Sequence, residues 1–138
     1  MNEILAKQLA IDFCTDVNSI LSKENVFTEY KQLEGRRIFK EGECYFKAAS
    51  VNGKIVASGR KDIIQWAREK FKTENGAWFM DMGCLHKVEE GLLRFQCRIG
   101  QAHPFYIATE KSDVDTKDYD IKTVSYTHLR AHETSQDL

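Results

Sequence analysis

The spacing of apolar residues along the chain predicts three amphipathic helices. Apolar side chains recur every three or four positions over residues 3–13, between Gly59 and Asn75, and over residues 84–96, which is the period of a helix with one buried face. The positions expected on these faces are Ile4, Leu5, Leu9 and Phe13 in the first segment, Ile63, Ala67 and Phe71 in the second, and Leu85, Val88, Leu92 and Phe95 in the third. Asp16 is expected to cap a further short helix that ends near Leu21.

Four other segments have the composition of β-strands. VFTEYK (26–31) alternates apolar and polar residues, AWFMDM (77–82) suits a buried strand, and CRIGQAHPFYIA (97–108) contains Pro104, which forces an edge position, a bulge or a break. The clearest signal is CYFKAASVNGKIVASG (44–59), where Asn52-Gly53 separates two β-prone runs. Both central residues of a type I′ turn need positive φ, which Asn and Gly adopt readily, so a hairpin is predicted here.

The alternation of these helices and strands predicts an α+β fold. We expect one domain over residues 1–109, built from a largely antiparallel sheet with helices packed on it. Residues 110–123 are rich in Lys, Asp, Ser and Thr, which is typical of a polar linker. The chain contains no internal repeats.

Composition narrows the classes of function. The 138 residues carry a formal net charge of -1, so no basic field favours nucleic acid or an anionic membrane. No apolar run reaches the roughly eighteen residues of a membrane span, and the first residues do not resemble a signal peptide. The four cysteines (Cys14, Cys44, Cys84 and Cys97) are widely spaced, which indicates reduced thiols rather than a zinc site or disulfides. We therefore expect a cytoplasmic protein without a bound metal.

The last fifteen residues differ in character from the rest. VSYTHLRAHET (Val124 to Thr134) resembles, residue for residue, one reading frame of the transposase-type adapter used to prepare sequencing libraries. Ser135 and Gln136 fall where a sample barcode would lie, and Asp137-Leu138 fit the constant segment beyond it. His128 and His132 have the i, i+4 spacing of helical metal ligands but no third ligand beside them. We interpret residues 124–138 as a non-native tail, so that the natural sequence is expected to reach only to about Thr123 here and to lack its original continuation.

Residues 9–108 resemble the N-terminal domain of a group of bacterial GNAT-type N-acetyltransferases. The resemblance rests on KQLAIDFC, ENVFTEYKQLEGRRIF, CYFKAASVNGKIVASGRKDIIQWAREKF, GAWFMDM and GQAHPFYIA, and it runs through to the linker DYDIK. In such proteins this module precedes the catalytic domain. The resemblance therefore implies an accessory domain that shapes the substrate side of the enzyme or packs on the catalytic domain.

The sequence departs from the catalytic pattern of that family. GNAT catalysis needs a Gln/Arg-x-x-Gly-x-Gly/Ala loop whose backbone amides bind the pyrophosphate of acetyl-CoA. In QLEGRR (32–37), Arg37 stands where the last small residue belongs, and Arg98-Ile99-Gly100 has its glycine one position early. By resemblance, acetyl-CoA would bind only in the missing C-terminal domain, and this chain is expected to hold no cofactor and to have no activity by itself.

Four residues are candidates for a binding site. Arg36, Arg37, Lys40 and His103 could form an anion-binding cluster, with solvated charges at a turn as the alternative. His103 has the chemistry of a general base, but the sequence places no nucleophile or carboxylate beside it. The aromatic residues Trp66, Trp78, Phe79 and Phe105 could line a pocket or form the core. Glu89 and Glu90 are expected on a solvated helix face.

Two functions remain open at this point. One is the accessory domain of an acetyltransferase, with the missing catalytic domain as its partner. The other is a stand-alone protein-binding or inhibitor module recovered from environmental bacterial or phage DNA. Neither needs a nucleic acid or a membrane, and self-association is possible in both.

Overall fold

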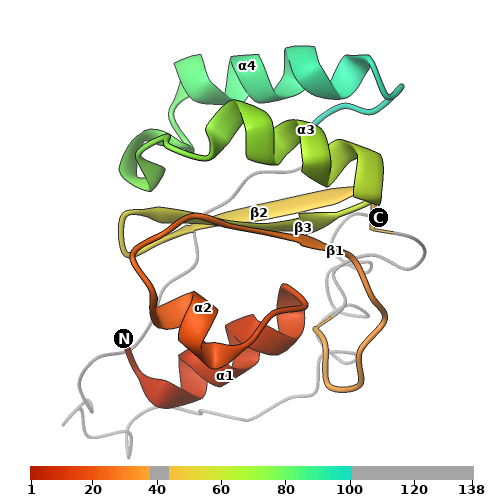
Figure 1. The fold of residues 1–138 in the computed structure, drawn as a ribbon. Helices are drawn as coiled ribbons and strands as arrows, with labels where there is room; N and C mark the ends of the chain where they lie inside the picture. Colours follow the sequence, from red (N-terminus) through yellow and green to blue (C-terminus); the bar gives the residue numbers. More distant parts are fainter. Residues whose placement is uncertain (38–43, 101–138) are drawn as a thin grey trace, which may run out of the picture. The chain divides into compact units, whose positions relative to one another are not determined.

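The computed structural model describes residues 1–37 and 44–100, and Figure 1 shows their arrangement. The elements, in chain order, are α1 (Glu3–Asp12), α2 (Val17–Leu21), β1 (Val26–Glu29), β2 (Phe46–Val51), β3 (Lys54–Gly59), α3 (Lys61–Phe71), the 3-10 helix η1 (Gly76–Trp78) and α4 (Met82–Leu93). Helices and strands together give the predicted α+β class. In the described part of the chain no helix is both long and apolar enough to span a membrane.

The three strands form a mixed sheet in the order β1-β3-β2. β2 and β3 pair antiparallel over six residue pairs, from Phe46↔Gly59 to Val51↔Lys54. β1 lies on the other side of β3 and runs parallel to it, with Val26 beside Val56. The predicted hairpin is confirmed, because Asn52 and Gly53 have φ values of 50° and 76° at the turn.

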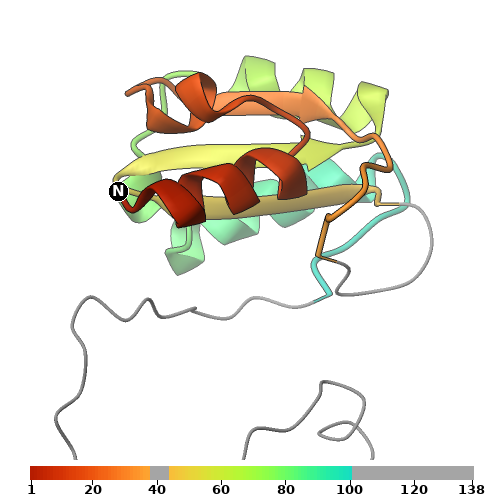
Figure 2. The same cartoon turned by 90° about the horizontal axis from the view of Figure 1, so that it is seen from below.

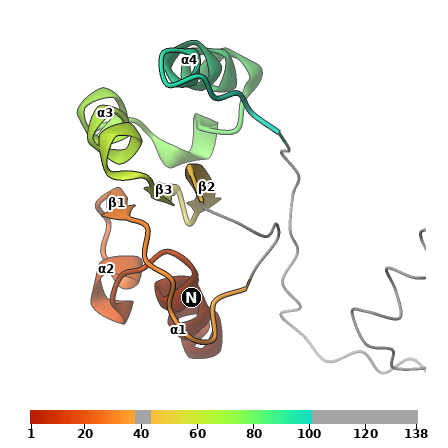
Figure 3. The ribbon, with the colours of Figure 1, turned by 90° about the vertical axis from the view of Figure 1, so that its right-hand side faces the viewer.

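Helices cover both faces of the sheet. α1 and α2 lie against one face, and α3 and α4 lie on the opposite side, with α4 outermost (Figures 1 and 3). Figure 2, seen from below, shows α1 and α2 side by side in front of the strands. Each face has its own core: one joins α1 and α2 to Val51 and Val56, and the other joins α3 and α4 to Phe27, Ile55 and Ala57. Alternate residues of β3 therefore serve the two cores, which is why all six of its residues are buried.

Local capping signals explain where the short helices begin. The Asp16 carboxylate accepts a hydrogen bond from the Ser19 amide at 2.7 Å, as an N-cap does at the start of α2. Asn75 accepts one from the Ala77 amide at 2.9 Å and caps η1. The helical spacing predicts a helix between Gly59 and Asn75, but α3 ends at Phe71 and Asn75-Gly76 open the next helix.

The prediction of a buried strand over residues 77–82 is wrong. This segment forms most of η1, a turn and the first residue of α4. Gly76 fixes its course, because a Cβ there would lie 2.3 Å from the carbonyl carbon of Lys54. The segment turns so tightly against β3 that Phe79 is buried while Trp78 is 64% exposed.

Two further expectations need correction at the ends of the domain. Leu9 and Phe13 of the first predicted helix are buried as predicted, but Ile4 is 78% exposed because the buried face of α1 runs through Ala6, Leu9 and Ala10. Residues 97–100 form no strand, although a strand was expected over 97–108. The remainder of that segment, 101–108, lies outside the described residues.

Candidate functional site

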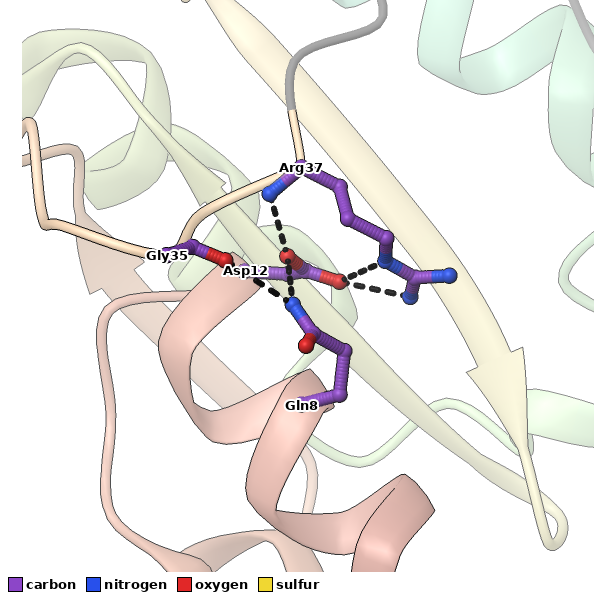
Figure 4. A network of polar contacts seen from close by, with 4 residues as sticks. All are labelled: Gln8, Asp12, Gly35 and Arg37. Atoms are coloured by element: carbon purple, nitrogen blue, oxygen red, sulfur yellow. Dashed lines mark hydrogen bonds and ion pairs between the residues drawn. The ribbon is translucent and has the colours of Figure 1, made fainter. Parts of the chain in front are cut away.

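A buried carboxylate organises the end of α1. Asp12 is the last residue of that helix and is 2% exposed. Its Oδ2 accepts from the Nε of Arg37 at 2.7 Å, and the Arg37 Nη2 lies 2.6 Å from the same oxygen (Figure 4). Its Oδ1 accepts from the Arg37 backbone amide at 2.9 Å and from the Gln8 side-chain amide at 2.9 Å. These charge-assisted contacts compensate the cost of burying Asp12.

The segment 35–37 is bound to α1 by this network. Gly35 has a φ of 80°, a left-handed conformation that glycine adopts without strain. Its carbonyl accepts a second hydrogen bond from Gln8 Nε2, at 3.2 Å. The Arg37 side chain and the backbone of Gly35 and Arg37 are therefore all hydrogen-bonded to side chains of α1.

Arg36 and Lys47 bring two more cations to the same end of α1. The Arg36 guanidinium carbon lies 4.4 Å from the centre of the Tyr30 ring, and the Lys47 Nζ lies 4.9 Å from the centre of the Phe13 ring. The buried Arg36 Nε has no hydrogen-bond partner among the described residues. Basic side chains here complement the negative end of the α1 dipole.

Lys47 belongs to a row of polar residues that crosses the sheet. Thr28, Ser58 and Lys47 are register neighbours on β1, β3 and β2, so their side chains share the face that α1 covers. The Thr28 hydroxyl donates to the Phe13 carbonyl. Ser58 is fully buried, and its hydroxyl has no partner within residues 1–37 and 44–100.

Burial shifts the proton affinity of two groups in this region. Removal from water lowers the pKa of Lys47, although Cys44 opposes the shift electrostatically. Burial likewise raises the pKa of the Cys44 thiol, against the attraction of Lys47 and Arg36. Both shifts favour the neutral forms, so Cys44 is not an activated thiolate at neutral pH.

All four cysteines are free and half-buried. Cys14 joins α1 to the segment after β1, because its Sγ donates to the Lys31 carbonyl at 3.2 Å and lies 3.3 Å from the Lys31 amide nitrogen. No group of three or more His, Cys, Asp or Glu side chains within the described ranges could hold a metal ion. The two contacts with Lys31 indicate that Cys14 has a packing role.

The structure places two of the four predicted binding residues. Arg36 and Arg37 are neighbours, but Arg37 is engaged by Asp12 while Arg36 stacks on Tyr30. Lys40 and His103 lie outside the described residues, so the four-residue anion cluster stays a prediction. Asp12 and Lys47 could not be singled out from the sequence, because their partners lie 25 and 34 positions away along the chain.

The aromatic residues divide between core and surface. Phe79 is buried against Phe71, with ring centres 5.5 Å apart, and Trp66 packs between α3 and α4. Trp78 is exposed, and Phe105 lies beyond the described part of the chain. Glu89 is half-buried and Glu90 is exposed on α4, with Glu90 3.7 Å from His86.

The comparisons with protein families, curated proteins and solved structures return no match for this sequence.

Proposed function

We propose that this chain is the accessory N-terminal domain of a GNAT-type N-acetyltransferase and that it does not itself bind acetyl-CoA. The tail at 124–138 is taken as foreign to that role. The sequence resemblance over residues 9–108 suggests the family. The claim that this chain does not bind acetyl-CoA rests on the position of Arg37.

QLEGRR is the nearest approach in this sequence to the loop that binds pyrophosphate in the family. Such a loop works because its backbone amides point at the phosphates from the start of a helix. Here the Arg37 amide points at Asp12 instead, at 2.9 Å from its Oδ1. A phosphate at this point would also meet the carboxylate that Arg37 already neutralises. The segment is therefore suited to fastening the chain to α1 and not to holding a dinucleotide.

An exposed apolar surface supports a role in contacting another protein. Trp78, Met80 and Met82 are close in sequence and are 64%, 39% and 82% exposed. Large apolar side chains grouped in this way are typical of surfaces that another domain covers. They give a catalytic domain a place to pack.

Calorimetric titration with acetyl-CoA tests the first claim. We expect no binding heat at micromolar protein, with a catalytically competent GNAT enzyme as the positive control. Stoichiometric binding would show that the acetyl-CoA site lies in this chain and would overturn the proposal.

The accessory role needs a separate experiment. The natural reading frame is expected to continue past DYDIK into a Gln/Arg-x-x-Gly-x-Gly/Ala loop, and the catalytic domain encoded there should bind this chain. Met82→Ser should weaken that binding. Ile4→Ser is the matched control, because Ile4 is 78% exposed and lies on α1, across the sheet from α4.

The same apolar surface also fits the alternative function, a stand-alone protein-binding module. The natural gene distinguishes the two functions by the residues that it encodes after DYDIK. A natural frame that ends without the loop would support the module and contradict the acetyltransferase.

A further inference from the structure

A buried lysine lies at the turn of the hairpin. Lys54 is the first residue of β3 and is 4% exposed. Its ammonium donates to two carbonyl oxygens at the end of α2, Ser19 at 2.6 Å and Ser22 at 2.9 Å. The third contact, to the Ser22 hydroxyl, is 3.4 Å long and correspondingly weak. One donor of a buried cation therefore remains poorly used.

Lys54 also lines a cavity of about 430 Å³ between α2 and the hairpin turn. The other lining residues are Met1, Ile20, Leu21, Ser22, Lys23 and Asn52. Ile20 is only 1% exposed, so the accessible apolar surface of the cavity comes from Leu21 and Met1, which are 53% and 43% exposed.

The charged side chains that line this cavity are all basic. Lys54 and Lys23 both line it, and none of its lining residues is acidic. Glu24 acts on Lys54 electrostatically but is not among the residues that line the cavity. Within the described residues, the hydrogen bonds of the Lys54 ammonium go to carbonyl and hydroxyl oxygens and not to a carboxylate. A buried cation paired in this way, beside apolar walls, is complementary to a ligand with an anionic head and an aliphatic tail.

We propose that this cavity binds a small amphiphilic anion, namely a carboxylate with a short aliphatic chain. The carboxylate takes the weakly used donor of Lys54, with Lys23 adding attraction at the mouth. The aliphatic chain lies against Leu21 and Met1. This site is independent of the acetyltransferase assignment, since it uses neither the segment 32–37 nor the Trp78 surface.

Amide-resolved NMR titration of the full chain with hexanoate tests the site. We expect saturable shifts at the lining residues, with a dissociation constant on the order of 1–10 mM for a ligand of this size. Acetate should bind at least about tenfold more weakly, because it lacks the methylenes that contact the apolar wall. Hexylamine, with the same tail and the opposite charge, should cause no saturable shift.

Two variants separate recognition from folding. Lys23→Glu reverses an exposed charge at the mouth and should weaken hexanoate binding by at least about threefold. Lys87→Glu makes the same change on α4, away from the cavity, and should leave binding unchanged. Lys54→Met keeps the length of the side chain without its charge and should abolish binding wherever it folds.

Three results would overturn the site. They are an absence of saturable hexanoate shifts at the lining residues, equal binding of hexylamine, and equal binding of acetate. Unchanged hexanoate affinity in Lys23→Glu would likewise contradict the role given to the cavity charge, even if Lys54→Met failed to fold.

Discussion

The indole ring of Trp66 on α3 occupies the space that a side chain at Gly91 on α4 would need. A Cβ at Gly91 would lie 1.7 Å from Cζ2 of Trp66, far inside contact distance. The ring also meets Phe71 edge-on, with centres 5.8 Å apart, and lies 6.1 Å from the centre of Phe95. Gly91 therefore allows α4 to pack directly on the aromatic side chains of α3.

Gly91→Ala should destabilise the domain by roughly 1–3 kcal/mol, because the added methyl must displace Trp66 or separate the helices. Urea unfolding measures the change. Gly83→Ala in the same helix is the control: a Cβ there meets nothing within 4 Å, and alanine favours a helix by up to about 1 kcal/mol. Equal stability of the two variants would refute the close contact.

Gly53→Val tests the hairpin turn. A Cβ at Gly53 meets no atom within 4 Å, so any loss comes from the φ of 76° and not from a clash. We expect a loss of about 1–3 kcal/mol in unfolding free energy, since a β-branched residue resists positive φ. Gly53→Asn should cost less, because asparagine tolerates this conformation. A thermal midpoint for Gly53→Val within error of the parent would remove the type I′ assignment.

Asp12→Asn tests the network at the end of α1. The substitution keeps the shape of the side chain but removes the charge that pairs with Arg37, so we expect a loss of about 1–3 kcal/mol. Glu3→Gln is the matched control, since its pair with Lys7 is 77% and 63% exposed and should contribute less than about 1 kcal/mol. Chemical denaturation of both variants at one ionic strength makes the comparison. A cost for Asp12→Asn no larger than that of Glu3→Gln would show that the network contributes no stability.

Lys54 predicts a pH dependence. Burial lowers its pKa in the folded state below the ordinary value of 10.5, so the folded state binds fewer protons than the unfolded chain between those two values. The cost of burying the charge is present at neutral pH and is relieved as pH rises through that window. The stability of the parent should therefore rise relative to Lys54→Met between neutral pH and about pH 10.

Taking the difference between parent and variant removes the contributions of other groups. The raised thiol pKa of Cys44 and Cys84 acts in the opposite direction at alkaline pH, and the lowered pKa of Lys47 acts in the same direction. All three are common to both proteins. Denaturant unfolding at several pH values gives the difference, and a flat difference would contradict the shift at Lys54.

The sequence predicted those elements that neighbouring residues determine. The Asn52-Gly53 turn, the Asp16 cap and the buried face of α3 each depend on residues a few positions apart, and all three are confirmed. The prediction for 77–82 failed because its apolar residues suited a strand, while its path depends on Gly76 packing against Lys54. That contact joins positions 22 residues apart.

Less of the candidate site than of the fold could be predicted from the sequence. Arg36 and Arg37 stood out as a basic pair, but the partner of Arg37 is a carboxylate in an apolar helix 25 positions earlier. Charge in the sequence shows which side chains are ionic but not which of them meet. Lys54 gave no signal at all, since a lysine after a hairpin turn is ordinarily solvated.

The place of β3 in the middle of the sheet has a consequence for the order of folding. Its antiparallel partner is joined to it by a two-residue turn, whereas its parallel partner β1 pairs Val26 with Val56, thirty positions along the chain. The shorter loop closes at a smaller entropic cost, so the hairpin can form, together with the adjacent α3, before the first thirty residues dock. The N-terminal helices and β1 would then assemble late, on a template whose central strand already presents both of its faces.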